Sequence, residues 1–250
     1  MAHACRRNPR FWCETTHRPC SAPPCYAVNA RLVPDAIQFH RILVMRTIRR
    51  KRLAETTRPQ VFIIESLSLD DEREDRFEGR VLKDILALGG KKSAYYYIRT
   101  QRELEKIVTL FSKSGFRYLH ISCHGNTTEM ATTFDRISFP ELGQILRPHL
   151  RGRRIFLSAC EMTTKKLANE LLLHGSGCYS LIGPVEKVYF SDAALLWSSF
   201  YHLAFRTNDA AMKRKWVLAH LRSTATLFNV RMNYFSASRT KGVRATSVAP

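Results

Sequence analysis

Two residues that could do covalent chemistry each follow an apolar segment of the chain. Residues 118–123 form one such segment, which ends at His124 and Gly125, and residues 154–159 form another, which ends at Cys160. Parallel strands that are buried on both faces have this apolar character, and ligands collect just beyond their carboxyl ends. Two neighbouring strands would therefore bring an imidazole and a thiol to one edge of a sheet, as base and nucleophile.

A thiol is a weak nucleophile until a base or a lowered pKa removes its proton. We expect His124 to act as acid and base, and Cys160 as nucleophile, in an acyl transfer. Cys160 precedes a helical segment, whose N-terminus would favour the thiolate. The backbone N–H groups of Gly125 and Cys160 are the expected oxyanion donors. The plainer alternative is that Cys160 is an inert buried residue and that His124 only makes a hydrogen bond.

The segments around these residues alternate between strand-like and helical patterns. Strands are predicted at residues 61–64, 94–98, 117–123, 155–158 and 179–182. Helices are predicted at residues 70–88, 103–111, 140–146, 167–175, 192–205 and 210–228. This alternation predicts an α/β fold with a doubly wound, mostly parallel sheet and helices on both faces. Side chains alternate along a strand, so Cys123 should point away from His124 and pack in the core.

The charge of the chain divides it into regions. The net charge is +19, and Lys and Arg are in excess near both ends, while the middle is nearly neutral. Residues 1–33 are predicted to be a disordered, basic extension rich in Cys and Pro, and residues 34–58 a basic helix or linker. Residues 59–230 would form one catalytic domain that includes a basic C-terminal helix. Residues 231–250 would form a basic tail. Basic ends can bind nucleic acid, but a solvated surface is the preferred interpretation.

The cysteines and the hydropathy pattern indicate a cytoplasmic protein. No apolar stretch approaches a membrane span and no signal peptide is evident, so no membrane association is expected. Seven cysteines are an odd number, which favours free thiols in a reducing compartment. Cys5, Cys13, Cys20 and Cys25 lie near His17, but they lack the paired spacing of zinc ligands. We therefore expect neither a metal nor a cofactor.

A strand that ends in His-Gly, followed by a strand that ends in Ala-Cys, resembles the caspase-like cysteine peptidases. This group includes caspases, separase, gingipains and the bacterial CHAT domains. Residues 158–161, Ser-Ala-Cys-Glu, look most like the CHAT version and depart from the Gln-Ala-Cys-Arg-Gly of true caspases. Residues 180–201 are also similar to CHAT domains, and the whole resemblance covers residues 60–205. It implies a caspase-like doubly wound fold and a dyad of His124 and Cys160 without an obligatory third residue.

The resemblance also indicates where a substrate would bind. The stretch after the first strand, which binds the substrate in caspases, is acidic here and includes Glu65 and Asp70. In separase-like relatives an acid after the fifth strand serves this pocket, and Asp192 or Glu186 could match it. These acids would suit a substrate with Arg or Lys at the cleaved position. Alternatively, acids at helix N-termini only stabilise the helices, with Asp192 as an N-cap.

The leading hypothesis is a cysteine endopeptidase that cleaves a protein partner. The resemblance implies a role in bacterial signalling or defence, with activity awaiting an activating protein partner or self-association. The first alternative is a catalytically silent, caspase-like interaction scaffold. The second is a nucleic-acid-binding protein that uses its basic termini, although no recognition motif is present. The substrate, the cleavage site and the oligomeric state stay open.

Overall fold

The computed structural model describes residues 57–238 and 242–250. The extension predicted for residues 1–33 lies outside these residues, as does nearly all of the linker predicted for residues 34–58. Among the described residues, no helix is long and apolar enough to cross a membrane.

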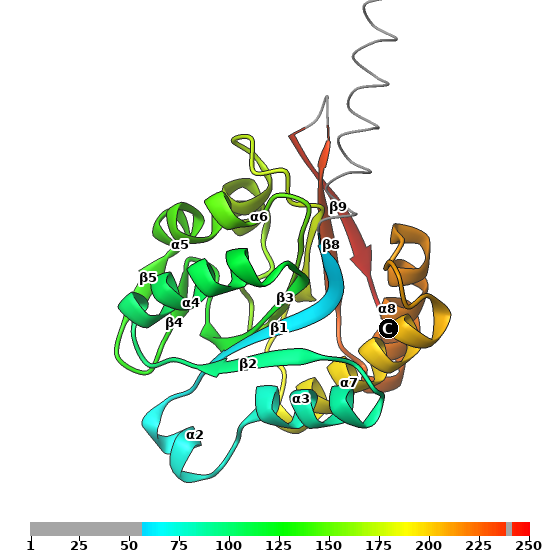
Figure 1. Ribbon diagram of the computed structural model, residues 1–250, viewed down its shortest axis with the longest axis horizontal. Helices are drawn as coiled ribbons and strands as arrows, with labels where there is room; N and C mark the ends of the chain where they lie inside the picture. The colour runs from blue at the N-terminus through cyan, green and yellow to red at the C-terminus, as the bar shows by residue number, and fades with distance from the viewer. Residues whose placement is uncertain (1–56, 239–241) are drawn as a thin grey trace, which may run out of the picture. The chain divides into compact units, whose positions relative to one another are not determined.

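The described residues form a nine-stranded sheet in which the strand order is β2-β1-β3-β6-β7-β8-β9 (Figure 1). Its strands are β1 (Arg58–Ser66), β2 (Ser93–Tyr97), β3 (Phe116–Gly125), β6 (Arg154–Ser158), β7 (Ser180–Pro184), β8 (Met232–Ser238) and β9 (Gly242–Val248), with β4 (Glu129–Ala131) and β5 (Arg136–Ser138) off this path. The five strands from β2 to β7 pair in parallel, whereas β8 and β9 pair antiparallel. The prediction of a mostly parallel sheet is confirmed.

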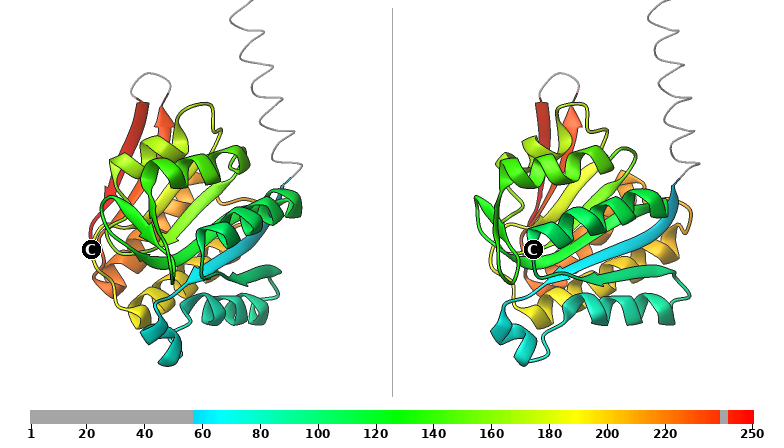
Figure 2. Two further views of the ribbon diagram at one scale, coloured as in Figure 1. Left: turned by 90° about the vertical axis from the view of Figure 1, so that its left-hand side faces the viewer. Right: turned by 60° about the vertical axis from the view of Figure 1, so that its left-hand side comes forward.

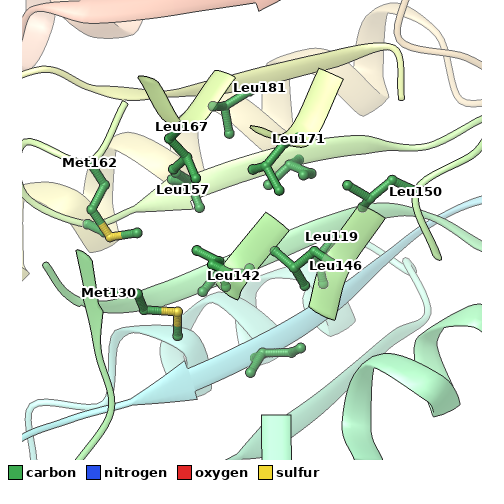
Figure 3. Close-up of a cluster of buried hydrophobic side chains, with 14 of the residues drawn as sticks. Leu119, Met130, Leu142, Leu146, Leu150, Leu157, Met162, Leu167, Leu171 and Leu181 are labelled. Carbon is green, nitrogen blue, oxygen red and sulfur yellow. The ribbon is translucent and has the colours of Figure 1, made fainter. Parts of the chain in front are cut away.

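Helices cover both faces of the sheet, as predicted (Figure 2). They are α2 (Leu69–Arg73), α3 (Glu78–Leu88), α4 (Gln101–Ser114), α5 (Phe139–Leu146), α6 (Lys165–Leu172), α7 (Phe190–Thr207) and α8 (Arg214–Phe228). Apolar residues of α4, α5 and α6 pack on one face in the cluster drawn in Figure 3. Those of α3, α7 and α8 pack on the other face. The sheet is therefore doubly wound.

The register of β3 and β6 sets the position of the two reactive residues. The strands pair in parallel with Ser122 opposite Ser158, and each serine precedes a reactive residue by two positions. Side chains at positions i and i+2 of a strand lie on one face. His124 and Cys160 therefore follow a matched pair of serines on the face that α3, α7 and α8 cover.

The segment predicted as a basic tail, residues 231–250, instead forms the antiparallel strands β8 and β9. The reason is its apolar alternation. Met232 and Tyr234 are buried in one core cluster, whereas Phe235 is buried in the other. A strand that contributes side chains to both cores is held in the sheet, and Arg244 of the neighbouring strand β9 is exposed.

Two further predictions are wrong in detail. Residues 126–137 form the hairpin of β4 and β5 rather than a polar loop, because Met130 and Ile137 are fully buried. The helix predicted for residues 70–88 is divided into α2 and α3. Asp75 lies between them with a φ of 52°, a left-handed conformation that no helix interior contains. The chain therefore changes direction between α2 and α3.

Candidate active site

The structure brings His124 and Cys160 together at one cavity. Both residues line a space of about 50 Å³ between the ends of β3 and β6 and the first turns of α7. The His124 side chain is 40% exposed and Cys160 is half-buried, so solutes can reach both. The walls are mostly apolar and include Phe190 and Trp197.

Cys160 lies in a turn rather than at a helix N-terminus. The next helix, α6, begins at Lys165 and is capped by the Thr164 side chain, so it cannot act on the thiol as the sequence analysis expected. The Cys160 Sγ instead lies 3.9 Å from the carbonyl oxygen of Val188, to which it donates. Glu161, the next residue, has a φ of 57°, which is unfavourable for a residue with a side chain. The turn that presents the thiol is therefore strained.

His124 is held by a carboxylate. Its Nε2 lies 2.6 Å from Oδ2 of Asp71, and its ring meets the ring of Phe190 edge to face with centroids 5.6 Å apart. Asp71 itself is 6% exposed and is bound by the Ser68 hydroxyl and by the Arg76 guanidinium, at 2.9 Å for Arg76. The imidazole therefore has a fixed orientation and a buried anionic partner.

The state of Asp71 determines the tautomer of His124. Burial acts to raise the pKa of Asp71, but hydrogen bonds from Ser68, His124 and Arg76 outweigh it and hold the pKa below its usual value. An ionised carboxylate only accepts hydrogen bonds, so Nε2 of His124 must carry the proton. The Nδ1 atom is then the ring nitrogen that can accept a proton.

Asp71 is a site residue that the sequence analysis missed. It lies in the acidic stretch after the first strand, but nothing in that stretch separates it from Asp70 or Asp75 by residue type. The one local signal is the Ser68-x-x-Asp71 spacing, which is typical of a helix start, and here the Ser68 side chain accepts a hydrogen bond from Asp71 N. The capping serine turns Asp71 inward while Asp70 stays in solvent.

Gly125 is required by close packing. A Cβ atom at this position would lie 2.3 Å from Sδ of Met162 and 3.0 Å from the carbonyl oxygen of Glu129. Met162 is fully buried and has little room to move. The glycine therefore allows the chain after His124 to pass beside the segment that follows Cys160.

The two acids expected after the first strand lie away from the cavity. Glu65 is fully buried, and its carboxylate accepts hydrogen bonds from Gly79 N at 2.6 Å and from the Tyr95 hydroxyl at 2.8 Å. It faces inward because it is part of β1, and burial raises its pKa to about 7. Asp70 is 80% exposed and pairs with Arg73. Neither lines the space beside Cys160.

The two acids expected after the fifth strand line a neighbouring groove instead. Glu186 accepts hydrogen bonds from the backbone N–H of Arg231 at 2.8 Å and from its Nε at 3.0 Å, so its charge is compensated. Asp192 lies in the first turn of α7, but the N-cap is Tyr189 and no side chain caps this helix. The expectation that Asp192 is the N-cap is therefore wrong.

The remaining described cysteines are buried. Cys123 packs in the core with the residues of α4 to α6, as predicted, and burial raises its thiol pKa. Burial likewise raises the pKa of Cys178 to about 12. Within the described part of the chain, no three His, Cys, Asp or Glu side chains are grouped so that they could hold a metal ion. The four N-terminal cysteines lie outside the described residues.

No protein-family model and no curated protein matches this chain. Among solved structures, it is similar to the Arg-specific cysteine proteinase gingipain R, with 11% identity and a TM-score of 0.46 over 71% of this chain and 46% of that one. It is also similar to a secreted C11 cysteine protease from Bacteroides thetaiotaomicron, with 13% identity and a TM-score of 0.45 over 72% of this chain and 66% of that one. The chain thus spans about half of the first protein and two thirds of the second.

Proposed function

We propose that the protein is a cysteine endopeptidase in which His124 activates Cys160. The observation that carries this proposal is that the Cys160 thiol and the His124 imidazole line one accessible cavity. Nε2 of the imidazole is held there by the buried carboxylate of Asp71. A nucleophile, its base and a group that orients the base are the parts that covalent acyl transfer needs. The substrate is a protein, and the cleaved bond is an amide.

The proposed reaction has two stages. In the first, the Cys160 proton passes to Nδ1 of His124, and Sγ attacks the carbonyl carbon. The C–N bond then breaks, His124 returns the proton to the leaving amine, and a thioester stays on Cys160. In the second, His124 takes a proton from water, the hydroxide displaces the thiolate, and Cys160 regains its proton. Asp71 stabilises the imidazolium that forms in each stage.

The oxyanion of each stage needs hydrogen-bond donors. The proposed donors are the backbone N–H groups of Gly125 and Cys160. The close packing at Gly125 supports the first, because only glycine lets the chain lie there. The turn at Cys160 supports the second, because no described residue accepts a backbone hydrogen bond from its N–H.

A peptide with a thiol-reactive end group tests the proposal. We expect it to label full-length protein at Cys160, and to label Cys178→Ala equally well, because Cys178 is buried in the core. Cys160→Ala should lose the label, and His124→Ala should slow labelling at least 100-fold, within the usual contribution of an acid–base group. Labelling of Cys160 that proceeds at the same rate without His124 would contradict the peptidase and favour a catalytically silent scaffold.

A further inference from the structure

A buried carboxylate lines the cavity beside the reactive pair. Glu78, the first residue of α3, is 4% exposed, and the cavity extends from it and Trp197 to the more exposed His124 and Cys160. The cavity therefore has an accessible end with the thiol and an inner end with an acid.

Glu78 is held in place by the two serines that precede the reactive residues. Its Oε2 accepts hydrogen bonds from Ser122 Oγ at 2.9 Å and from Ser158 Oγ at 2.7 Å. These serines face each other across β3 and β6. The register that places Ser122 opposite Ser158 therefore also positions the Glu78 carboxylate close to the ends of these two strands.

The second oxygen of Glu78 has no hydrogen-bond partner. Oε1 is buried, and Nε2 of His120, which also has no hydrogen-bond partner, lies 3.7 Å away, beyond hydrogen-bond distance. No Lys or Arg lines the cavity. A buried carboxyl oxygen without a donor is unfavourable, and a cationic donor from outside would remove this penalty.

We infer that this cavity receives the side chain of the residue whose carbonyl group is attacked, and that Glu78 makes it select arginine or lysine. This inference rests on the proposed function. Sγ bonds to the carbonyl carbon, and the side chain of that residue starts one atom away, so it must enter the space next to Cys160. Leu196 and Trp197 provide an apolar wall for its methylene groups, and Glu78 meets its charge.

Paired peptides with arginine or with citrulline at the cleaved position test the selectivity. Citrulline has the shape of arginine without its charge. We expect the full-length protein to cleave the arginine peptide with a kcat/KM at least 100-fold higher, the size of effect that an unpaired buried charge produces. Glu78→Gln should abolish most of this difference, and Glu78→Asp should keep part of it.

Glu65→Gln is the matched control. Glu65 is also a buried carboxylate, and it binds Gly79, the neighbour of Glu78, but it does not line the cavity. This variant should keep the preference for arginine. Equal cleavage of both peptides by the unmodified protein, a preference for aspartate, or a preference that survives Glu78→Gln would overturn the inference.

A binding measurement separates this inference from the proposed function. Agmatine, a small guanidinium compound, should bind the full-length protein and slow alkylation of Cys160 by iodoacetamide. We expect its affinity to fall at least tenfold in Glu78→Gln and to be unchanged in Glu65→Gln, whose residue does not line the cavity. Agmatine binding without peptide cleavage would support the pocket and contradict the peptidase. Absence of agmatine binding in a protein that cleaves peptides would contradict the pocket alone.

Discussion

Nε2 of His124 lies 2.6 Å from Oδ2 of Asp71, and Asp71 is anchored in turn by Ser68 and Arg76. The histidine belongs to a strand of the sheet, whereas the aspartate belongs to the short helix α2 that follows another strand. A resemblance to caspase-like peptidases implies a dyad without an obligatory third residue. Under the proposed function, Asp71 is a positioning residue in addition to this dyad.

Asp71→Asn tests this role. We expect kcat to fall about 10- to 100-fold, because the neutral amide no longer stabilises the imidazolium, while KM stays nearly constant. Steady-state kinetics on a peptide substrate measure both values. Asp70→Asn is the control, because Asp70 is an exposed neighbour of the same type. Equal effects of the two substitutions on kcat would show that the contact between Asp71 and His124 does not contribute to catalysis.

Glu65 should make the stability of the protein depend on pH. Its pKa is about 7 in the folded protein, raised mainly by burial, against an ordinary value of 4.5. Between these values the folded state holds a proton that the unfolded state has lost, so its stabilising effect is complete below pH 4.5 and is lost as the pH rises through 7. The expected loss is about 3 kcal/mol.

Urea unfolding at pH 5 and at pH 8 measures this effect. Glu65→Gln cannot ionise, but it keeps an oxygen for the Gly79 N–H. The free energy of unfolding of this variant should therefore decrease less between the two pH values than that of the unmodified protein. If both proteins lose the same amount, Glu65 is not the group responsible.

Gly125→Ala should destabilise the protein by about 1–3 kcal/mol, because the new methyl group would overlap Met162. Thermal unfolding measures the change. Gly89→Ala is the control, because its Cβ would come no closer than 3.4 Å to its nearest neighbour, Leu86 O. A combination of Gly125→Ala with Met162→Ala should cost less than the sum of the two single changes. Strict additivity would contradict the contact.

Glu161→Gly should raise the free energy of unfolding by about 1 kcal/mol relative to Glu161→Ala, because only glycine adopts a φ of 57° without strain. Both variants lack the carboxylate, so their comparison isolates the backbone term. Chemical denaturation measures the difference. A more stable alanine variant would mean that the turn after Cys160 relaxes at no cost.

The parallel strands of the sheet could be predicted because each of them is a short run of apolar residues. The apolar run at 117–123 corresponds to β3, Phe116–Gly125, and a buried strand needs such residues wherever the chain goes next. Strands β8 and β9 carry a weaker signal. The alternation of Met232 and Tyr234 is present in the sequence, but the basic residues of the segment, such as Arg231 and Arg244, favour the prediction of a tail.

The acids of the site could not be chosen in the same way. Glu65, Asp70, Asp71 and Glu78 are of one chemical type, and residue type alone does not say which of them turns toward the sheet. The Ser68-x-x-Asp71 spacing is the one local signal, and it marks Asp71 alone. The serines at positions 122 and 158 offered a clue, because each lies two residues before a reactive side chain and therefore on its face.

Val230 and Met232 line the cavity with Cys160, although they follow it by about seventy residues in the chain. Protein synthesis runs from the N-terminus, so His124 and Cys160 leave the ribosome well before this part of the cavity wall exists. The nascent polypeptide would thus carry both reactive groups without a finished pocket between them. Under the proposed function, peptide cleavage would therefore begin only after β8 has been added.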